Sequence, residues 1–173
     1  MATARALIRG LVTRPDNLAE CLTQVNRLLY ADVGDSGRFM SLFFLMLDQG
    51  SRWISWVRAG HDPAIFYDPA KDMMDELVGP GMVLGVEEDY CYQQADKTIE
   101  TEGAIILIGT DGIWETHNGE GELFGKERLH QIIRENAHKS AEAIQEAVLA
   151  GVSKFRGKLP QEDDITIVVI KTV

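Results

Sequence analysis

The stretch AIILIGTDGIWET, residues 104–116, places an acid shortly after an unbroken run of apolar residues. The run at 104–108 shows no alternation of apolar and polar side chains, which predicts a strand covered on both of its faces. Asp111 follows this strand, between Thr110 and Gly112. The pattern therefore predicts an acidic side chain held at the rim of a rigid sheet.

Upstream of this strand, the sequence predicts two helices followed by a β-rich middle. Residues 2–12 have a helical pattern, and a second helix after Pro15 carries apolar residues at the spacing i, i+3, i+4, i+7. This apolar stripe comprises Leu18, Cys21, Leu22, Val25, Leu28 and Leu29. The predicted strands of the middle cover 39–47 and 52–59, which form a hairpin around Gln49-Gly50, then 64–68, 73–78 and a polar strand ending near Glu102.

Downstream, the pattern predicts helices at 126–135 and 141–155 and a closing strand at 165–173. Helices at both ends of a group of strands are typical of an α+β fold in which helices pack on antiparallel sheets. The sequence contains no repeat, low-complexity tract or linker, so we predict a single domain over residues 1–173.

The net charge and the cysteine content of the chain indicate which partners and which cellular setting to expect. A net charge of −10 provides no general positive field for nucleic acid or an anionic membrane surface, so we predict contact with neither. Cys21 and Cys91 are the two cysteines and lack metal-ligand spacing, which favours a reducing, cytoplasmic setting. The opening residues carry arginines within their apolar pattern, and no uncharged apolar stretch approaches the roughly 20 residues of a membrane span.

A second acidic cluster, Glu162-Asp163-Asp164, directly precedes the closing strand. If this strand neighbours 104–108, their ends bring Asp111 and Asp163 together. Two close carboxylates repel each other unless one pKa rises, a base pairs with them or a cation binds. Bases are scarce nearby, and hard oxygen ligands suit Mg²⁺ or Mn²⁺. Taken separately, Asp-Gly is also typical of a turn, and the acidic cluster of a solvated loop.

Five segments resemble, in the same order, the signature segments of a known family. They are AGHDPAIFYDP (59–69), GMVLGV (81–86), ILIGTDGIWET (106–116), LFGKERL (123–129) and EDDITIVVIK (162–171). The family is that of metal-dependent protein phosphatases of the sporulation-protein-E and sigma-factor-regulation type, the SpoIIE and RsbU type, relatives of protein phosphatase 2C. The resemblance implies an antiparallel β-sandwich flanked by helices, with two Mn²⁺ or Mg²⁺ ions at one edge and activity toward phosphoserine or phosphothreonine.

The resemblance also implies the roles of individual residues. Asp111 and Asp163 match metal-ligand aspartates, and Gly112 continues the first of these motifs. Asp164 stands where relatives have Asp or Asn, and is the weaker candidate. Two cations can bind the phosphoryl oxygens and activate water, so we expect no catalytic residue beyond the metal ligands.

Several polar residues near these motifs have alternative roles. Thr110 and Thr166 flank the two acids, where their side chains either bind ligand and water or tie the loops together. His61 is next to Asp62-Pro63, which favours a structural hydrogen bond over catalysis. The other histidines are predicted on polar surfaces: His117, His130 and His138.

The resemblance has one departure. In the family, a Gly-Asp pair followed by a Gly-His-Gly turn supplies the aspartate that bridges both metals, and the match here begins later, inside the first helix, at MATARALIRG (1–10). We therefore expect a domain that lacks its first strands and one ligand. Such a chain would hold at most one ion weakly and would be impaired as an enzyme.

Two functions follow from the resemblance. In the first, the protein is a bacterial serine/threonine phosphatase that acts on a phosphorylated, STAS-type anti-sigma-factor antagonist in partner-switching signalling, under an upstream sensor or receiver domain. In the second, it is a catalytically dead module that docks such partners. Without the first strands, apolar residues of the 39–59 hairpin and strand edges would be unpaired, so we also predict homodimers formed by exchange of a strand or a helix, with the opening helix as the favoured element.

Overall fold

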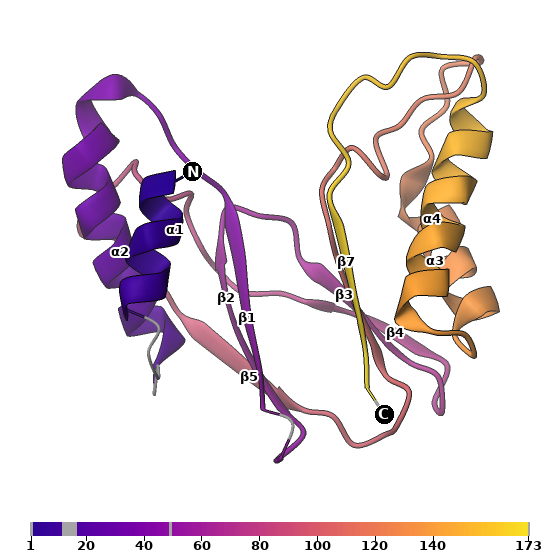
Figure 1. Cartoon of the computed structure of the whole chain (residues 1–173), viewed down its shortest axis with the longest axis horizontal. Helices are drawn as coiled ribbons and strands as arrows, with labels where there is room; N and C mark the ends of the chain where they lie inside the picture. Colours follow the sequence, from indigo (N-terminus) through magenta and orange to yellow (C-terminus); the bar gives the residue numbers. More distant parts are fainter. Residues whose placement is uncertain (1, 12–16, 49, 173) are drawn as a thin grey trace. The chain divides into compact units, whose positions relative to one another are not determined.

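The computed structural model describes residues 2–11, 17–48 and 50–172 (Figure 1). Their helices and strands, in chain order, are α1 (Ala2–Leu11), α2 (Leu18–Val33), a short 3-10 helix η1 (Gly34–Ser36), β1 (Leu42–Asp48), β2 (Trp53–Ala59), β3 (Ala64–Asp68), β4 (Met73–Leu77), β5 (Gln94–Thr98), β6 (Ile105–Gly109), α3 (Gly125–Asn136), α4 (Ala141–Arg156) and β7 (Ile167–Lys171). The strands form two antiparallel sheets, which confirms the α+β class. Val12, Pro15 and Gln49 lie outside the described residues.

The chain divides into two compact units. The first comprises Met1–Pro63 and Val78–Glu100, and the second comprises Ala64–Leu77 and Thr101–Val173. A single domain over residues 1–173 stays a prediction.

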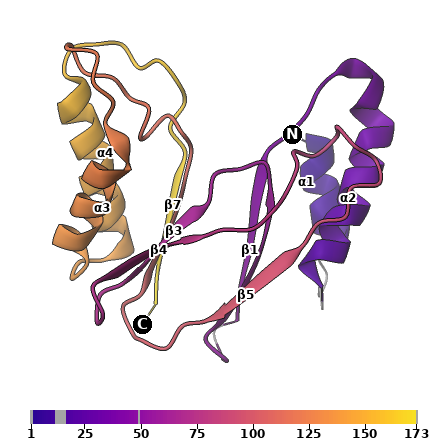
Figure 2. The same ribbon diagram turned by 180° about the vertical axis from the view of Figure 1, so that it is seen from behind.

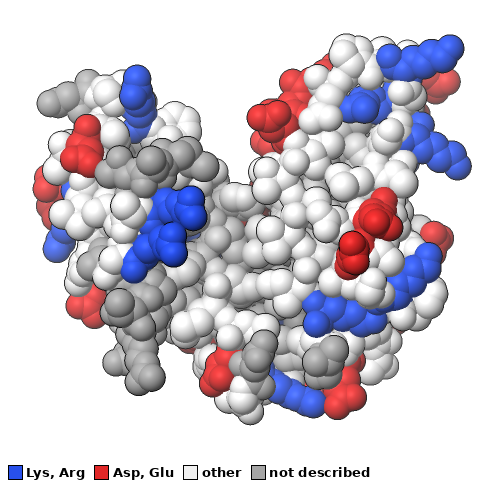
Figure 3. Space-filling model, in the orientation of Figure 1, with Lys and Arg blue, Asp and Glu red and all other residues white. Residues whose placement is uncertain are grey.

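In the described residues, no helix has the length and apolar character that crossing a membrane requires. Acidic and basic side chains are interspersed on the face of each unit in Figure 3.

In the first unit, the strand order is β1-β2-β5. β1 and β2 form the predicted hairpin, with Leu42 opposite Ala59. β1 begins later than predicted because Phe39 is exposed and Met40 makes only an isolated bridge with Leu84. β5 also ends earlier than Glu102, because its ladder with β2 closes at Thr98.

Helix α2 packs its apolar stripe into the core of the first unit. The Asn17 side chain caps its first turn by accepting a hydrogen bond from the Glu20 N–H. All but one of the predicted stripe residues are buried; Leu28, at one margin of the stripe, is 48% exposed. The buried Asn26 occupies the other margin, where its amide binds backbone groups of the 85–88 loop.

In the second unit, the strand order is β4-β3-β6-β7. β6 lies between β3 and β7 and is buried on both faces, as its unbroken apolar sequence predicts. Ile105 and Leu107 pack with Leu129 of α3 and Val148 of α4, so these two helices cover one face of the sheet (Figures 1 and 2). The second unit thereby fixes the central strand that leads to Asp111.

Candidate functional site

The two acidic clusters lie at one edge of the four-stranded sheet. β6 and β7 are antiparallel neighbours, and Gly109 at the end of β6 pairs with Ile167 at the start of β7. The loop that follows β6 and the loop that precedes β7 therefore leave the sheet side by side. This confirms the strand pairing that the approach of Asp111 and Asp163 requires.

Thr110 ties these two loops together. Its N–H donates to the Thr166 carbonyl at 3.1 Å, and its hydroxyl donates to the Asp164 carbonyl at 3.1 Å. The same hydroxyl oxygen accepts from the Thr166 N–H at 3.0 Å. The sequence left two roles open for Thr110, binding of ligand or water and tying of the loops. The structure shows that Thr110 ties the loops.

Gly112 permits the loops to approach this closely. A Cβ atom at Gly112 would lie 2.6 Å from the backbone oxygen of Asp164, well inside normal contact distance. The backbone of Gly112 does not have the positive φ that favours glycine. Space, rather than backbone conformation, therefore requires glycine here.

Asp111 and Asp163 are exposed carboxylates with similar local geometry. In each, Oδ1 accepts a hydrogen bond from the next residue's N–H: Gly112 at 3.0 Å and Asp164 at 2.7 Å. Within the described part of the chain, no hydrogen bond occupies the second oxygen of either carboxylate. Asp164 is also exposed and enters the loop network through its backbone.

The chemistry of these carboxylates suits a hard divalent cation, but they do not make a complete site. Across residues 2–11, 17–48 and 50–172, no group of three or more His, Cys, Asp or Glu residues is placed to hold a metal ion. Asp111, Asp163, Gly112 and Asp164 as the metal-site residues stay a prediction.

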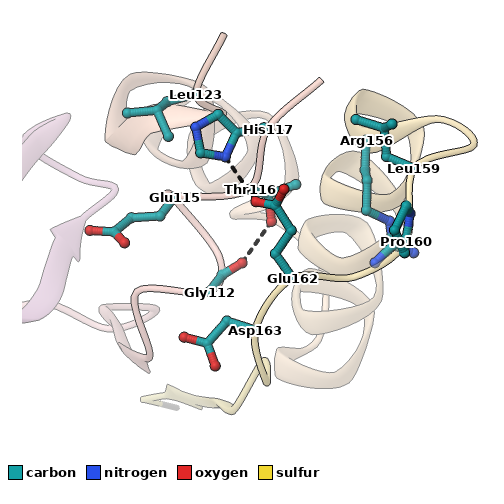
Figure 4. A pocket seen from close by; sticks show the side chains of 10 residues that line it. All are labelled: Gly112, Glu115, Thr116, His117, Leu123, Arg156, Leu159, Pro160, Glu162 and Asp163. Atoms are coloured by element: carbon teal, nitrogen blue, oxygen red, sulfur yellow. Dashed lines mark hydrogen bonds and ion pairs between the residues drawn. The ribbon is translucent and has the colours of Figure 1, made fainter. Parts of the chain in front are cut away.

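A pocket of about 340 Å³ lies beside this edge of the sheet (Figure 4). Its walls come from the loop after β6, the end of α4 and the loop before β7, and they include Gly112 and Asp163. The pocket is therefore continuous with the predicted metal-site residues.

A contact between His117 and Glu162 bridges the pocket. His117 Nδ1 lies 3.0 Å from Glu162 Oε2, and their side chains are 42% and 63% exposed. The pair joins the loop after β6 to the residue before Asp163 (Figure 4). The sequence placed His117 on a polar surface without this partner, because the two residues come from segments far apart in the chain.

Two other histidines have different environments. His61 Nδ1 lies 2.9 Å from the Asp62 carbonyl oxygen and its ring meets Phe43 edge-on, which fits the structural role favoured by the sequence. His130 is half-buried, and its Nε2 is enclosed with no hydrogen-bond partner among the described residues, so its prediction as a surface histidine is wrong. Burial lowers the pKa of His130.

Comparisons with known proteins bear on this site. The family model for stage II sporulation protein E (SpoIIE) matches residues 1–173. The phosphoserine phosphatase RsbU of Bacillus subtilis (strain 168) is 26% identical over 153 residues, which are 88% of this chain and 44% of RsbU. The chain thus spans less than half the length of this relative.

Solved structures show the same fold. The SiaA-PP2C domain of Pseudomonas aeruginosa superposes with a TM-score of 0.84 at 22% identity, over 99% of this chain and 68% of that one. The phosphatase domain of SpoIIE from Bacillus subtilis, presoaked with Mn, gives a TM-score of 0.65 at 14% identity, over 98% of this chain and 73% of that one. These likenesses confirm a fold of the protein phosphatase 2C type.

Proposed function

The chain belongs to the family of stage II sporulation protein E, and on this premise we propose that it forms part of a metal-dependent serine/threonine protein phosphatase. One observation supports the proposal above all. The loops after β6 and before β7 are hydrogen-bonded to each other, and they place Asp111 and Asp163 at one edge of a sheet in a fold of this family. The likeness to the phosphoserine phosphatase RsbU supports phosphoserine as the substrate group.

The reaction is the hydrolysis of a phosphate monoester: water attacks phosphorus, the bond from phosphorus to the serine oxygen breaks, and serine and phosphate are released. Divalent cations supply the charge that stabilises the phosphoryl oxygens and activates water in such reactions. Asp111 and Asp163 would hold Mn²⁺ or Mg²⁺, with Asp164 as a weaker contributor. Thr110 and Gly112 keep the two aspartate-bearing loops in register.

We further propose that a complete centre takes an additional aspartate from outside residues 1–173. Two findings support this: the described residues contain no group of three potential ligands, and the chain spans 44% of RsbU. The substrate that we propose is a phosphorylated STAS-type anti-sigma-factor antagonist in the bacterial cytoplasm, with an upstream sensor or receiver domain setting the activity. The support for this substrate, location and upstream domain is the resemblance of the sequence to phosphatases of the SpoIIE and RsbU type.

The test compares Mn²⁺-dependent hydrolysis of a phosphoserine peptide by this chain and by an upstream-extended form. We expect little or no hydrolysis by the chain alone. In the extended form, Asp111→Asn and Asp163→Asn should each lower the rate by about two or more orders of magnitude, because each removes a charged ligand while keeping its shape. Asp164→Asn should have a milder effect.

Asp32→Asn is the matched control, since Asp32 is exposed on α2, in the first unit. Equal hydrolysis by the chain and the extended form would overturn the need for an outside ligand. If Asp163→Asn left the rate unchanged while Asp164→Asn abolished it, the metal ligand would be Asp164.

The second candidate function is a catalytically dead module that docks the same partners. The lack of a complete ligand group in the described residues favours it. It predicts that the extended form binds a phosphorylated antagonist without turnover in Mn²⁺, whereas the phosphatase releases phosphate.

Homodimers remain our proposal for the isolated chain, with α1 as the exchanged element. β1 and β5 are edge strands of the three-stranded sheet, and edges of this kind pair with other chains. Light scattering coupled to size exclusion tests this, and a monomer at high protein concentration would contradict it.

A further inference from the structure

Arg156 is an uncompensated cation in the wall of the pocket beside the aspartate loops. It ends α4, and its Nη1 donates to Gln161 Oε1 at 3.2 Å. Its Nε is enclosed and has no acceptor in the part of the chain that the structure describes, and no carboxylate there pairs with it. The guanidinium therefore keeps most of its hydrogen-bonding capacity.

Apolar side chains surround the approach to Arg156. Leu159 and Pro160 lie next to it at one end of the pocket, and Leu123 lies across from them (Figure 4). Leu123 is 49% exposed and Leu159 is 38% exposed, so both leucines offer apolar surface to a ligand. This end of the pocket thus combines a cation with an apolar wall.

Among the described residues, none of the acids that line the pocket pairs with Arg156. Glu162 pairs with His117, and the Asp163 carboxylate accepts from its own loop. In Figure 4, the side chains of Glu115 and Asp163 extend toward the opposite end of the pocket from Arg156. The pocket therefore has an acidic end, at the predicted metal site, and a cationic end, at Arg156.

We propose that Arg156 binds the carboxylate of an Asp or Glu side chain that flanks the phosphoserine of the protein substrate. A guanidinium holds a carboxylate by two parallel hydrogen bonds, and the two Nη atoms of Arg156 keep N–H donors beyond the one given to Gln161. The methylene groups of the acidic residue would pack on Leu159 and Pro160. This inference rests on the proposed phosphatase function and specifies its substrate: the phosphoryl group occupies the acidic end with the cations, and the neighbouring acid occupies the Arg156 end.

Hydrogen bonds link this subsite to the predicted metal site. Gln161 accepts from Arg156 and donates its Nε2 to the Asp163 carbonyl at 2.8 Å. A ligand that fixes the Arg156 side chain would thereby also steady the loop that carries Asp163. The acidic flank of the substrate would then contribute both to binding and to the order of the site.

The test measures binding of two fluorescent phosphoserine peptides in the presence of Mn²⁺, one flanked by glutamates and one by glutamines. We expect the chain alone, for which little or no hydrolysis is expected, to bind the glutamate peptide roughly 5- to 10-fold more tightly, a modest preference because the subsite is partly open to solvent. The upstream-extended form gives the same comparison if it binds the peptides without turnover. Arg156→Gln should bind both peptides equally. Lys154→Gln is the matched control, because Lys154 is an exposed cation in the last turn of the same helix.

Each outcome decides the inference separately from the phosphatase proposal. Equal binding of the two peptides by the unmodified protein, or a preference that survives Arg156→Gln, would overturn it. If Arg156 instead contacts the phosphoryl group, Arg156→Gln should weaken both phosphopeptides alike, which also overturns it. A glutamate preference that depends on Arg156 in an extended form without hydrolysis would uphold the subsite and reject the enzyme.

Discussion

Replacing Gly112 with alanine should force apart the two loops that carry the predicted metal ligands. The new Cβ would lie 2.6 Å from the Asp164 backbone oxygen, whereas real Cβ contacts are essentially never shorter than 3.0 Å and are ordinary from 3.4 Å. The loops must therefore separate by 0.4 Å (3.0 − 2.6) to 0.8 Å (3.4 − 2.6). The hydrogen bond from Thr110 Oγ1 to the same oxygen is already 3.1 Å long, so this movement would stretch or break it.

The expected loss of stability follows from these two effects. Overpacking costs about 1–3 kcal/mol, and the lost hydrogen bond about 1 kcal/mol. The alanine also restricts the unfolded chain, which returns about 0.4–1 kcal/mol. The free energy of unfolding should therefore fall by about 1–3.6 kcal/mol, which lowers the Tm by about 2–14 °C for a chain of this size.

Thermal unfolding followed by circular dichroism measures this effect. Gly119→Ala is the matched control, because Gly119 lies in the same connection between β6 and α3 and has no atom within 4 Å of the position of a Cβ. Its Tm should change little. If Gly112→Ala and Gly119→Ala unfold at the same temperature, the close approach of the two loops is not a constraint on this fold.

Three further changes test other parts of the structure. Asn26→Leu keeps the number and branching of the side-chain heavy atoms but removes the bonds to the Gly85 N–H (2.9 Å) and the Glu87 carbonyl (2.7 Å), so the free energy of unfolding should fall by about 2–4 kcal/mol in urea denaturation. Ser140→Ala removes the side-chain cap of α4 and should cost about 1 kcal/mol by the same measurement. Burial lowers the pKa of His130 in the folded state, so its contribution to stability is present above its unfolded pKa of about 6.5 and is lost as pH falls from there through the lower folded pKa. His130→Gln should therefore show a smaller loss of stability than the unmodified chain between about pH 7.5 and pH 5.5.

Matched controls separate these mechanisms from nonspecific damage. Gln24→Leu changes an exposed amide on α2, Ser153→Ala an exposed hydroxyl within α4, and His138→Gln an exposed histidine beyond α3. Each should leave the stability or its pH dependence nearly unchanged. If a control matches its test variant, the specific hydrogen bond or buried imidazole is not the cause.

The sequence determined those features that depend on local pattern. The unbroken apolar run 104–108 predicted a fully buried strand, and β6 is one because β3 and β7 pair on its two sides while helices cover a face. The hairpin of β1 and β2 followed from two β-rich runs and a short turn, and their register agrees with it. Helix boundaries near Gly125 and Ala141 agreed within a residue or so, because apolar periodicity and capping residues are local signals.

Long-range pairing decided what the local pattern left open. The helical stripe placed Leu28 in the core, but the margin that packs is the one where Asn26 finds backbone partners in the 85–88 loop. His130 was predicted on the surface from its polar neighbours in sequence, whereas the packing of its helix encloses one of its ring nitrogens. For Asn26 the deciding contacts come from residues distant in the chain, which no local period encodes.

The site shows the same division. The sequence alone predicted that Asp111 and Asp163 lie next to strands, because an acid beside an apolar run is a local pattern. Only the antiparallel pairing of β6 with β7 joins their loops through Thr110, and only this close approach explains the glycine at 112. Arg156 carries no sequence signal for a site, because the end of α4 reaches the pocket through the packing of that helix on the sheet and not through any motif.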